Sequence, residues 1–157
     1  DGWLHTGDRF RQDEDGFLYI TGRIKDYFKT LQGKFVAPTP IEAQFADNPY
    51  VEQQCLVGLG MNKTMMVAVI SETMRDAPRD VIEASVRATL SQLNEEVEKH
   101  ARMGGAILTY EPWSIENGVL TPTLKIKRDQ ISDRFGEEAA AMAIESAESK
   151  TLVIRWR

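Results

Sequence analysis

Apolar residues recur at helical spacing in two segments of the chain. The first set is Ile82, Val86, Leu90, Leu93 and Val97. The second set is Ile131, Phe135, Ala139 and Met142. Intervals of three and four residues place each set on one face, so the pattern predicts two amphipathic helices. We expect the first helix to lie between Pro78 and His100, with Gly104-Gly105 as its end signal.

Three short apolar runs predict strands, at residues 54–59, 65–71 and 106–110. The first two are separated by residues 60–63, a sequence typical of a hairpin loop. The order of strand, strand, helix, strand and helix predicts an α+β domain with a small three-stranded sheet flanked by helices. Residues 151–156 are also apolar and β-branched, but the pattern gives them no place in this sheet.

Small ribbons are expected before this sheet. Residues 13–16 are a turn sequence in front of the apolar run 17–20, which predicts a short β-hairpin. A second small ribbon is expected between residues 23 and 36. Ile41 and Phe45, four residues apart after two prolines, predict a short helix. The sequence therefore indicates an α+β domain preceded by a short β-hairpin ribbon.

Composition narrows the class of protein. The 157 residues include 19 Lys and Arg against 24 Asp and Glu, for a formal net charge of -5. This length favours one compact domain, and the acidic balance disfavours nucleic acid or an anionic membrane as partner. No apolar run approaches the ~20 residues of a transmembrane segment, and Cys55 alone forms no intrachain disulfide. A cytoplasmic setting is expected, and a start without Met or a signal peptide indicates a fragment or a processed chain.

Two clusters of cations stand out in this acidic chain and indicate local anion sites. The clusters are Arg23, Lys25, Lys29 and Lys34, then Lys125, Lys127 and Arg128. In an extended segment Lys125 and Lys127 face the same side. A helix beginning just after Thr123 would instead bring backbone N–H groups and one lysine to the same anion. Solvated surface loops are the alternative explanation for both clusters.

Other polar residues carry weaker signals. Asp8 follows Thr6-Gly7, and its carboxylate suits ribose hydroxyls, although on spacing alone a turn is the commoner explanation. His5 and His100 have no cysteine or carboxylate at ligand spacing, so no metal site is expected. Cys55 lies in an apolar run, which predicts a small buried side chain rather than a nucleophile.

Four ordered segments carry the most specific patterns. They are GWLHTGD (2–8), GFLYITGRIKD (16–26), GKFVAPTPIE (33–42) and LTPTLKIKR (120–128). Together they resemble the end of the adenylate-forming acyl-CoA synthetases in both order and spacing, over residues 1–135. In the last segment a threonine-leucine pair replaces the commoner serine-glycine pair, which resembles the long-chain fatty acyl branch.

The resemblance implies the small mobile C-terminal domain of such a ligase, closing over an N-terminal adenylation domain of the same polypeptide. It divides the chain into 1–24, the end of the large domain and hinge approach; 25–135, the lid domain; and 136–157, a helix extension and tail. Such ligases use ATP and Mg2+ to convert a fatty acid into acyl-AMP, then form the thioester of coenzyme A. The isolated chain is expected to be inactive, because the ATP and acyl pockets lie in the absent domain.

The same resemblance implies roles for five positions. Lys125 matches the catalytic lysine of adenylation. Asp8 and Arg23 match positions that hold the ribose of the nucleotide, and Lys25 matches the hinge. Gly33 matches the glycine beside the coenzyme A tunnel, where a turn with positive φ is a second reason for glycine.

Several alternatives stay open at this point. Lys127, two residues on, is the rival of Lys125. The chain could also be a stand-alone binding or regulatory module, part of a ligase for aryl or other carboxylic acids, or part of a fatty acyl-AMP ligase that forms no thioester. Residues 136–157 match no motif, so docking or dimerisation stays open for them. Peripheral attachment to a membrane through the absent domain also stays open.

Overall fold

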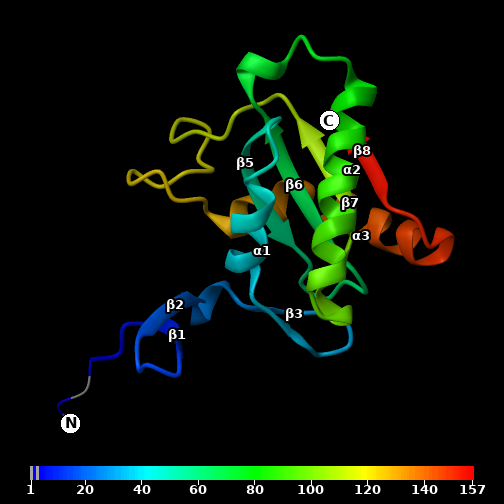
Figure 1. Cartoon of the computed structure of the whole chain (residues 1–157). Coiled ribbons are helices and arrows are strands. Elements are labelled where there is room, and N and C mark those ends of the chain that lie inside the picture. Colours follow the sequence, from blue (N-terminus) through cyan, green and yellow to red (C-terminus); the bar gives the residue numbers. More distant parts are fainter. Residues whose placement is uncertain (1, 3) are drawn as a thin grey trace.

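A four-stranded sheet forms the centre of the computed structural model, which describes residue 2 and residues 4–157. Asp1, and Trp3 of the first motif, lie outside the described residues. The strands, in spatial order, are β5 (Val51–Val57), β6 (Thr64–Ile70), β7 (Met103–Thr109) and β8 (Val153–Trp156). The β5–β6 pair is antiparallel, whereas β7 pairs in parallel with β6 and with β8 (Figure 1).

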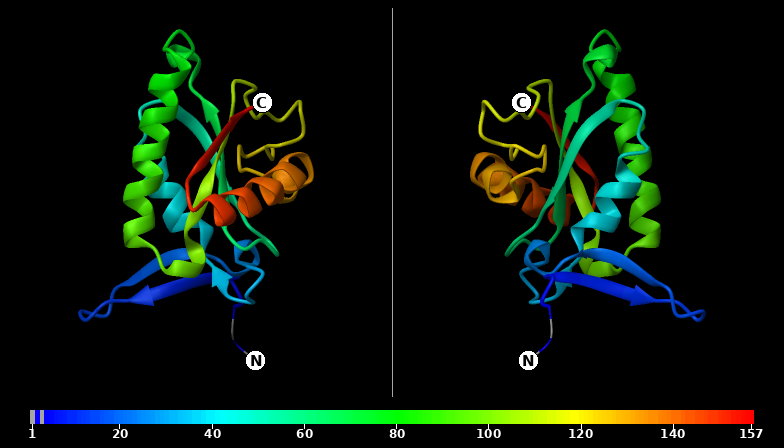
Figure 2. Two further views of the ribbon diagram at one scale, coloured as in Figure 1. Left: turned by 90° about the vertical axis from the view of Figure 1, so that its right-hand side faces the viewer. Right: turned by 90° about the vertical axis from the view of Figure 1, so that its left-hand side faces the viewer.

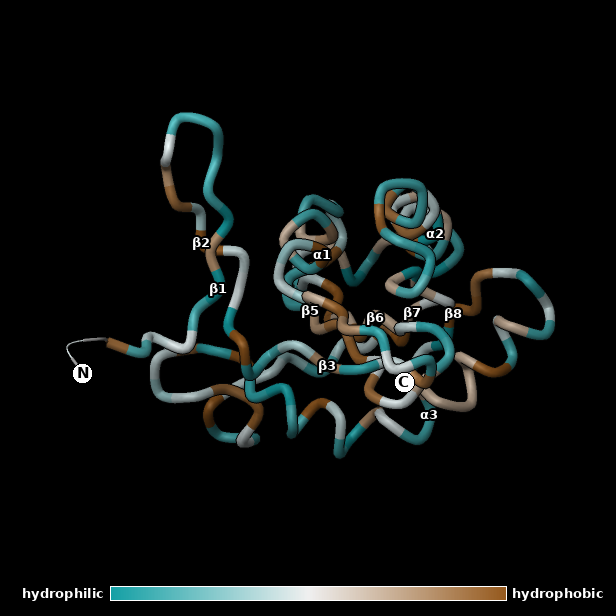
Figure 3. The backbone as a smooth tube through the Cα atoms, turned by 90° about the horizontal axis from the view of Figure 1, so that it is seen from below, coloured by the Kyte–Doolittle hydropathy of each residue, from teal (hydrophilic) through white to brown (hydrophobic). Residues whose placement is uncertain are grey.

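Helices cover both faces of this sheet. The helices are α1 (Pro38–Phe45), α2 (Arg79–Glu96) and α3 (Arg128–Ser149), and the short 3-10 turns are η1 (Ile24–Asp26), η2 (Glu72–Met74) and η3 (Lys99–Ala101). Helices α1 and α2 lie on one face, and α3 lies on the other (Figures 2 and 3). The two predicted helical stripes are confirmed, because their residues are the buried sides of α2 and α3, except that Val97 lies one residue after the end of α2.

The central strand β6 explains why its sequence is apolar without alternation. Met66 and Ala68 point into the core under α1 and α2, while Met65 and Val67 point into the core under α3. A strand that is buried on both faces needs apolar residues at every position. The predicted hairpin between β5 and β6 is confirmed.

The prediction of a three-stranded sheet is one strand short. Residues 153–156, which the sequence pattern left unplaced, form β8 and pair with β7. The glycine pair Gly104-Gly105 does not end a helix, because α2 ends at Glu96 and both glycines lie inside β7. A Cβ atom on Gly105 would lie 1.7 Å from the carbonyl oxygen of Val153, so the glycine permits the close approach of β8.

The segment after Phe135 belongs to the same core. Helix α3 continues without a break to Ser149 and buries Ala139, Met142 and Ser146 against the sheet. Within the described part of the chain, no helix is long and apolar enough to cross a membrane.

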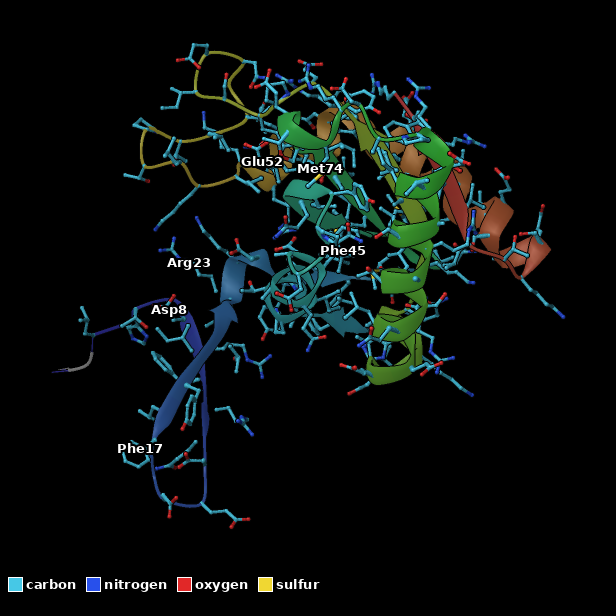
Figure 4. All side chains as sticks on the ribbon, turned by 45° about the horizontal axis from the view of Figure 1, so that its top comes forward. Asp8, Phe17, Arg23, Phe45, Glu52 and Met74 are labelled. Atoms are coloured by element: carbon cyan, nitrogen blue, oxygen red, sulfur yellow. The ribbon has the colours of Figure 1, made fainter. Side chains whose placement is uncertain are left out.

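Two ribbons precede the sheet, as expected. The first is the antiparallel hairpin of β1 (Asp8–Gln12) and β2 (Leu18–Arg23). The second pairs β3 (Phe28–Lys29) with β4 (Phe35–Val36). The β1–β2 hairpin projects from the body of the domain, with Phe17 near its tip (Figures 1 and 4). Turn η1 joins the two ribbons, so the chain changes direction there.

Candidate functional site

An open cleft of about 890 Å³ lies where η1, the end of the β1–β2 hairpin, α1 and the loop before α3 meet. Asp8, Arg23, Lys25 and Lys125 all line it, together with Lys127. Four of the five predicted site residues are therefore brought together from opposite ends of the chain. Gly33 does not line this cleft.

Asp8 and Arg23 face each other across the β1–β2 hairpin. They are paired in the strand register, and Nε of Arg23 lies 3.7 Å from Oδ1 of Asp8 (Figure 4). The Asp8 N–H donates to Oγ1 of Thr6 at 3.2 Å, which fixes the backbone in front of the strand. An ion pair this exposed contributes about 1 kcal/mol or less, so both groups keep capacity for a ligand. The pair places a carboxylate acceptor and a cation side by side at the cleft.

Lys125 is presented by a tight hairpin of the chain before α3. The N–H of Thr121 donates to the Lys125 carbonyl at 2.8 Å, and the N–H of Lys125 donates to Oγ1 of Thr121 at 3.1 Å. Between them Leu124 has a φ of 59°, the left-handed conformation that closes many three-residue hairpin loops. Leu120 and Ile126 form the bridge below. Of the two conformations considered for this segment, the structure shows the hairpin and not a helix that begins after Thr123, because α3 begins at Arg128.

The ammonium of Lys125 is accessible to a ligand in the cleft. Its side chain is exposed, and within residues 4–157 it forms no ion pair or side-chain hydrogen bond. A lysine that directly follows the turn 122–124 of this hairpin keeps a mobile charge on a long stem. Lys127 is also exposed at the cleft, but its backbone N–H is tied to the carbonyl of Val119 at 2.8 Å. Both lysines can therefore meet an anion in the cleft.

Arg128 does not belong to this group of free cations, contrary to the prediction. Its guanidinium donates to Oε1 and Oε2 of Glu42 at 2.7 Å and 3.0 Å, and to the carbonyl of Leu56 at 2.7 Å. Burial alone would lower the pKa of Arg128, but hydrogen bonds and charge from Glu42 outweigh it, so the pKa is raised. The second basic cluster therefore offers two lysines rather than three cations.

Sequence reasoning did not single out Glu42. The residue ends the third motif, 86 positions before Arg128, and no local spacing links them. Its Oε1 also accepts the N–H of Leu56 at 2.6 Å. The one signal in the sequence was that Glu42 ends the motif 33–42 and Arg128 ends the motif 120–128.

Lys25 lies within η1, between the two ribbons. The N–H of Ile24 donates to the carbonyl of Gly7 at 2.8 Å, and that of Tyr27 donates to the Ile24 carbonyl at 3.3 Å. Such a short turn between two elements is the type of position at which a few backbone rotations redirect a domain.

Gly33 closes the β3–β4 ribbon. Its φ is 74°, and its N–H donates to the carbonyl of Thr30 at 2.9 Å. The left-handed conformation explains a glycine here. A Cβ atom at this position would meet nothing within 4 Å, so the space beside the turn is open.

The structure gives Cys55 no place in the chemistry of the cleft. The residue is buried, and burial raises the pKa of its thiol to about 12. The thiol stays protonated at neutral pH, which agrees with the prediction of a small apolar side chain. Over the described residues, no group of three His, Cys, Asp or Glu side chains could hold a metal ion.

Comparison with known proteins adds a family to this geometry. The family described as AMP-binding enzyme C-terminal domain matches residues 25–146. Long chain acyl-CoA synthetase 7, peroxisomal, of Arabidopsis thaliana is 34% identical over 97% of this chain and 24% of its own length. Long-chain-fatty-acid–CoA ligase 5 of Rattus norvegicus is 32% identical over 86% of this chain and 22% of its own length. The chain thus spans about a quarter of the length of these relatives.

Solved structures share the fold. The adenylation domain of a carboxylate reductase from Mycobacterium chelonae superposes with a TM-score of 0.75 at 25% identity, over 91% of this chain and 23% of that one. The anthranilate CoA ligase AuaEII in complex with anthranoyl-AMP superposes with a TM-score of 0.63 at 21% identity, over 92% of this chain and 26% of that one. The α+β class with a small sheet, a hairpin and helices is thereby confirmed.

Proposed function

The chain belongs to the family of AMP-binding enzyme C-terminal domains, and we propose that it is the mobile C-terminal domain of an AMP-forming long-chain fatty acid–CoA ligase. The observation that carries the proposal is the exposed ammonium of Lys125, which has no partner among the described residues and lines the same cleft as Asp8 and Arg23. The names of the relatives support the long-chain acyl substrate.

The proposed first half-reaction is adenylation. A carboxylate oxygen of the fatty acid attacks the α-phosphorus of ATP, the bond to the β-phosphate bridging oxygen breaks, and pyrophosphate leaves. Negative charge gathers around the α-phosphate during this step, where the Lys125 ammonium would stabilise it. Such placed charges contribute about 3 kcal/mol to the transition state. In the second half-reaction the thiol of coenzyme A attacks the acyl carbon and AMP leaves.

The neighbouring residues take supporting roles in this proposal. Asp8 would accept hydrogen bonds from the ribose hydroxyls, and Arg23 beside it would hold the carboxylate in place and face the nucleotide. Gly33 would border the channel for the pantetheine arm, where its lack of a side chain leaves room. The described residues offer no cluster of three ligands for Mg2+, so we assign the metal and most of the ATP site to an N-terminal adenylation domain.

The decisive experiment separates the two half-reactions in the full-length protein. Lys125→Ala is expected to remove most pyrophosphate release from ATP and fatty acid, while sparing thioester formation from supplied acyl-adenylate. Lys127→Ala tests the rival lysine in the same cleft, and it is expected to keep both half-reactions if Lys125 is the catalytic lysine. An equal loss of both half-reactions in Lys125→Ala rejects the assignment.

Lys25 is the proposed hinge between the two poses of the domain. Lys25→Pro fixes φ near -65°, so it is expected to slow one half-reaction selectively. Lys25→Ala at the same position leaves the backbone free and is expected to retain both half-reactions.

The chain by itself is expected to release no pyrophosphate. We also propose a cytoplasmic location, which imaging of the tagged full-length protein tests against the peroxisomal location in the names of two relatives.

A further inference from the structure

Glu42 and Arg128 form a bidentate ion pair at the cleft. Two nitrogens of the guanidinium reach both carboxylate oxygens, at 2.7 Å and 3.0 Å, in the fork geometry that fixes orientation as well as distance. The side chains are only 22% and 16% exposed. Oε1 of Glu42 also accepts the N–H of Leu56, and Nη1 of Arg128 also donates to the Leu56 carbonyl. One helix, one strand and the start of α3 are thereby joined at a single point.

This joint lies directly at the base of the hairpin that carries Lys125. Arg128 follows Lys125 by three residues and is the first residue of α3. Lys127, the residue just before the helix, donates its N–H to the Val119 carbonyl at 2.8 Å. With both ends of the hairpin base fixed, its tip has a defined direction relative to α1.

Helix α1 also touches the approach to the hinge. A Cβ atom on Gly22 would lie 3.3 Å from Oγ1 of Thr39, so β2 runs close against the first turn of α1. Thr39 and Glu42 are three residues apart, which places them on neighbouring positions of one helical face. Both line the cleft. Helix α1 therefore contacts the strand that carries Arg23, and through Glu42 it binds Arg128 at the end of the segment that carries Lys125.

We propose that Glu42 and Arg128 are positioning residues, which set the direction of the Lys125 hairpin relative to α1 and to the nucleotide-facing pair Asp8 and Arg23. The inference rests on the proposed adenylation role of Lys125. Neither residue needs to touch the substrate. Their effect passes through the placement of the Lys125 ammonium, and a displacement of about 1 Å at a reacting group can cost about 100-fold in rate.

The pair is suited to this purpose because a point charge cannot replace it. Lysine at position 128 would keep the positive charge, but it would lose the two parallel hydrogen bonds and the contact with Leu56. Glu42→Gln keeps the side-chain volume and an acceptor for Leu56, but it removes the charge. Both variants therefore weaken the contacts among Glu42, Arg128 and Leu56 while a side chain of similar size stays in place.

The experiment is a double-mutant cycle in the full-length protein, with adenylation and thioester formation measured separately. Arg128→Lys and Glu42→Gln are each expected to lower the adenylation rate about 10-fold to 100-fold, with thioester formation from supplied acyl-adenylate unchanged. In a Lys125→Ala background, neither is expected to reduce adenylation further, because the group they position is gone. Arg155→Lys is the matched control, since Arg155 pairs with Glu145 at 2.5 Å on the β8 side of α3. It is expected to leave both half-reactions unchanged.

Three results would overturn the inference. A further loss of adenylation on the Lys125→Ala background would show an effect that does not pass through Lys125. Parallel loss of both half-reactions in Arg128→Lys and in Glu42→Gln would show a general role in folding. Unchanged adenylation in both variants would show that the pair positions nothing. An adenylation rate insensitive to Lys125→Ala is a different failure, because it rejects the proposed function itself.

Discussion

The backbone of Gly105 lies so close to that of Val153 that a Cβ atom would overlap the Val153 carbonyl oxygen at 1.7 Å. The two residues are partners in the parallel register of β7 and β8. Because β8 pairs with β7 along four residues, the C-terminal strand is part of the sheet, and a side chain at position 105 would disturb this pairing. The partly buried side chains of Val153, Ile154 and Trp156 consequently pack against the core on both faces of the sheet.

Gly105→Ala is expected to destabilise the protein by about 3 kcal/mol, because overpacking forces β8 away from β7. Urea unfolding measures the change. Gly136→Ala is the control with the opposite sign: this glycine lies inside α3 with open space around it, so alanine is expected to stabilise by about 0.5–1 kcal/mol. Equal stability of Gly105→Ala and the wild type would contradict the built-in position of β8.

Leu124 holds a conformation that suits glycine better. Its φ is 59° and its side chain is 68% exposed, so the strain has no burial to offset it. Leu124→Gly is expected to be neutral or stabilising by about 1 kcal/mol, since left-handed backbone costs an L-residue about 1–2 kcal/mol. Leu124→Val is expected to destabilise, because a β-branched side chain tolerates positive φ poorly. A higher melting temperature for Leu124→Val than for Leu124→Gly would contradict this conformation of the hairpin.

Gly33 allows its two explanations to be separated. Asparagine adopts the left-handed conformation more readily than other residues with side chains, so Gly33→Asn is expected to preserve the turn. If the glycine also borders the coenzyme A channel, the new side chain obstructs the channel. The expected result is normal adenylation with reduced thioester formation. Gly118→Asn, at another open position with positive φ, serves as control. Normal thioester formation in Gly33→Asn would leave the turn as the whole reason for glycine.

Cys55 makes stability depend on alkaline pH. Burial raises its pKa from 9.0 to about 12, so between these values the native thiol keeps a proton that the unfolded chain releases. Its contribution is therefore complete below pH 9 and is lost as the pH rises towards 12, with a slope of up to about 1.4 kcal/mol per pH unit. Urea unfolding over this pH range is expected to show a steeper decline for the wild type than for Cys55→Ala. Parallel declines would contradict a buried thiol.

Local pattern was sufficient for most elements of the fold. The stripes that begin at Ile82 and Ile131 predict α2 and α3 because helical spacing is a property of neighbouring residues. The same holds for the β1–β2 and β5–β6 hairpins, whose strands are joined by short turns. Strand β8 was not placed, because parallel pairing with β7 links Val153 to Gly105 across a long connection and leaves no local signal.

The candidate site divides in the same way. Motif and residue type single out Lys125, Asp8 and Arg23, because those features are written in short segments. By itself, the sequence determined most of the elements and singled out the candidate site residues. Only the tertiary structure decided that Lys125 faces the cleft with them, and that Arg128 is held by Glu42 instead of being free. The reason is physical: a largely buried cation needs a counter-charge wherever the folded chain supplies one, and for Arg128 that partner lies 86 residues away.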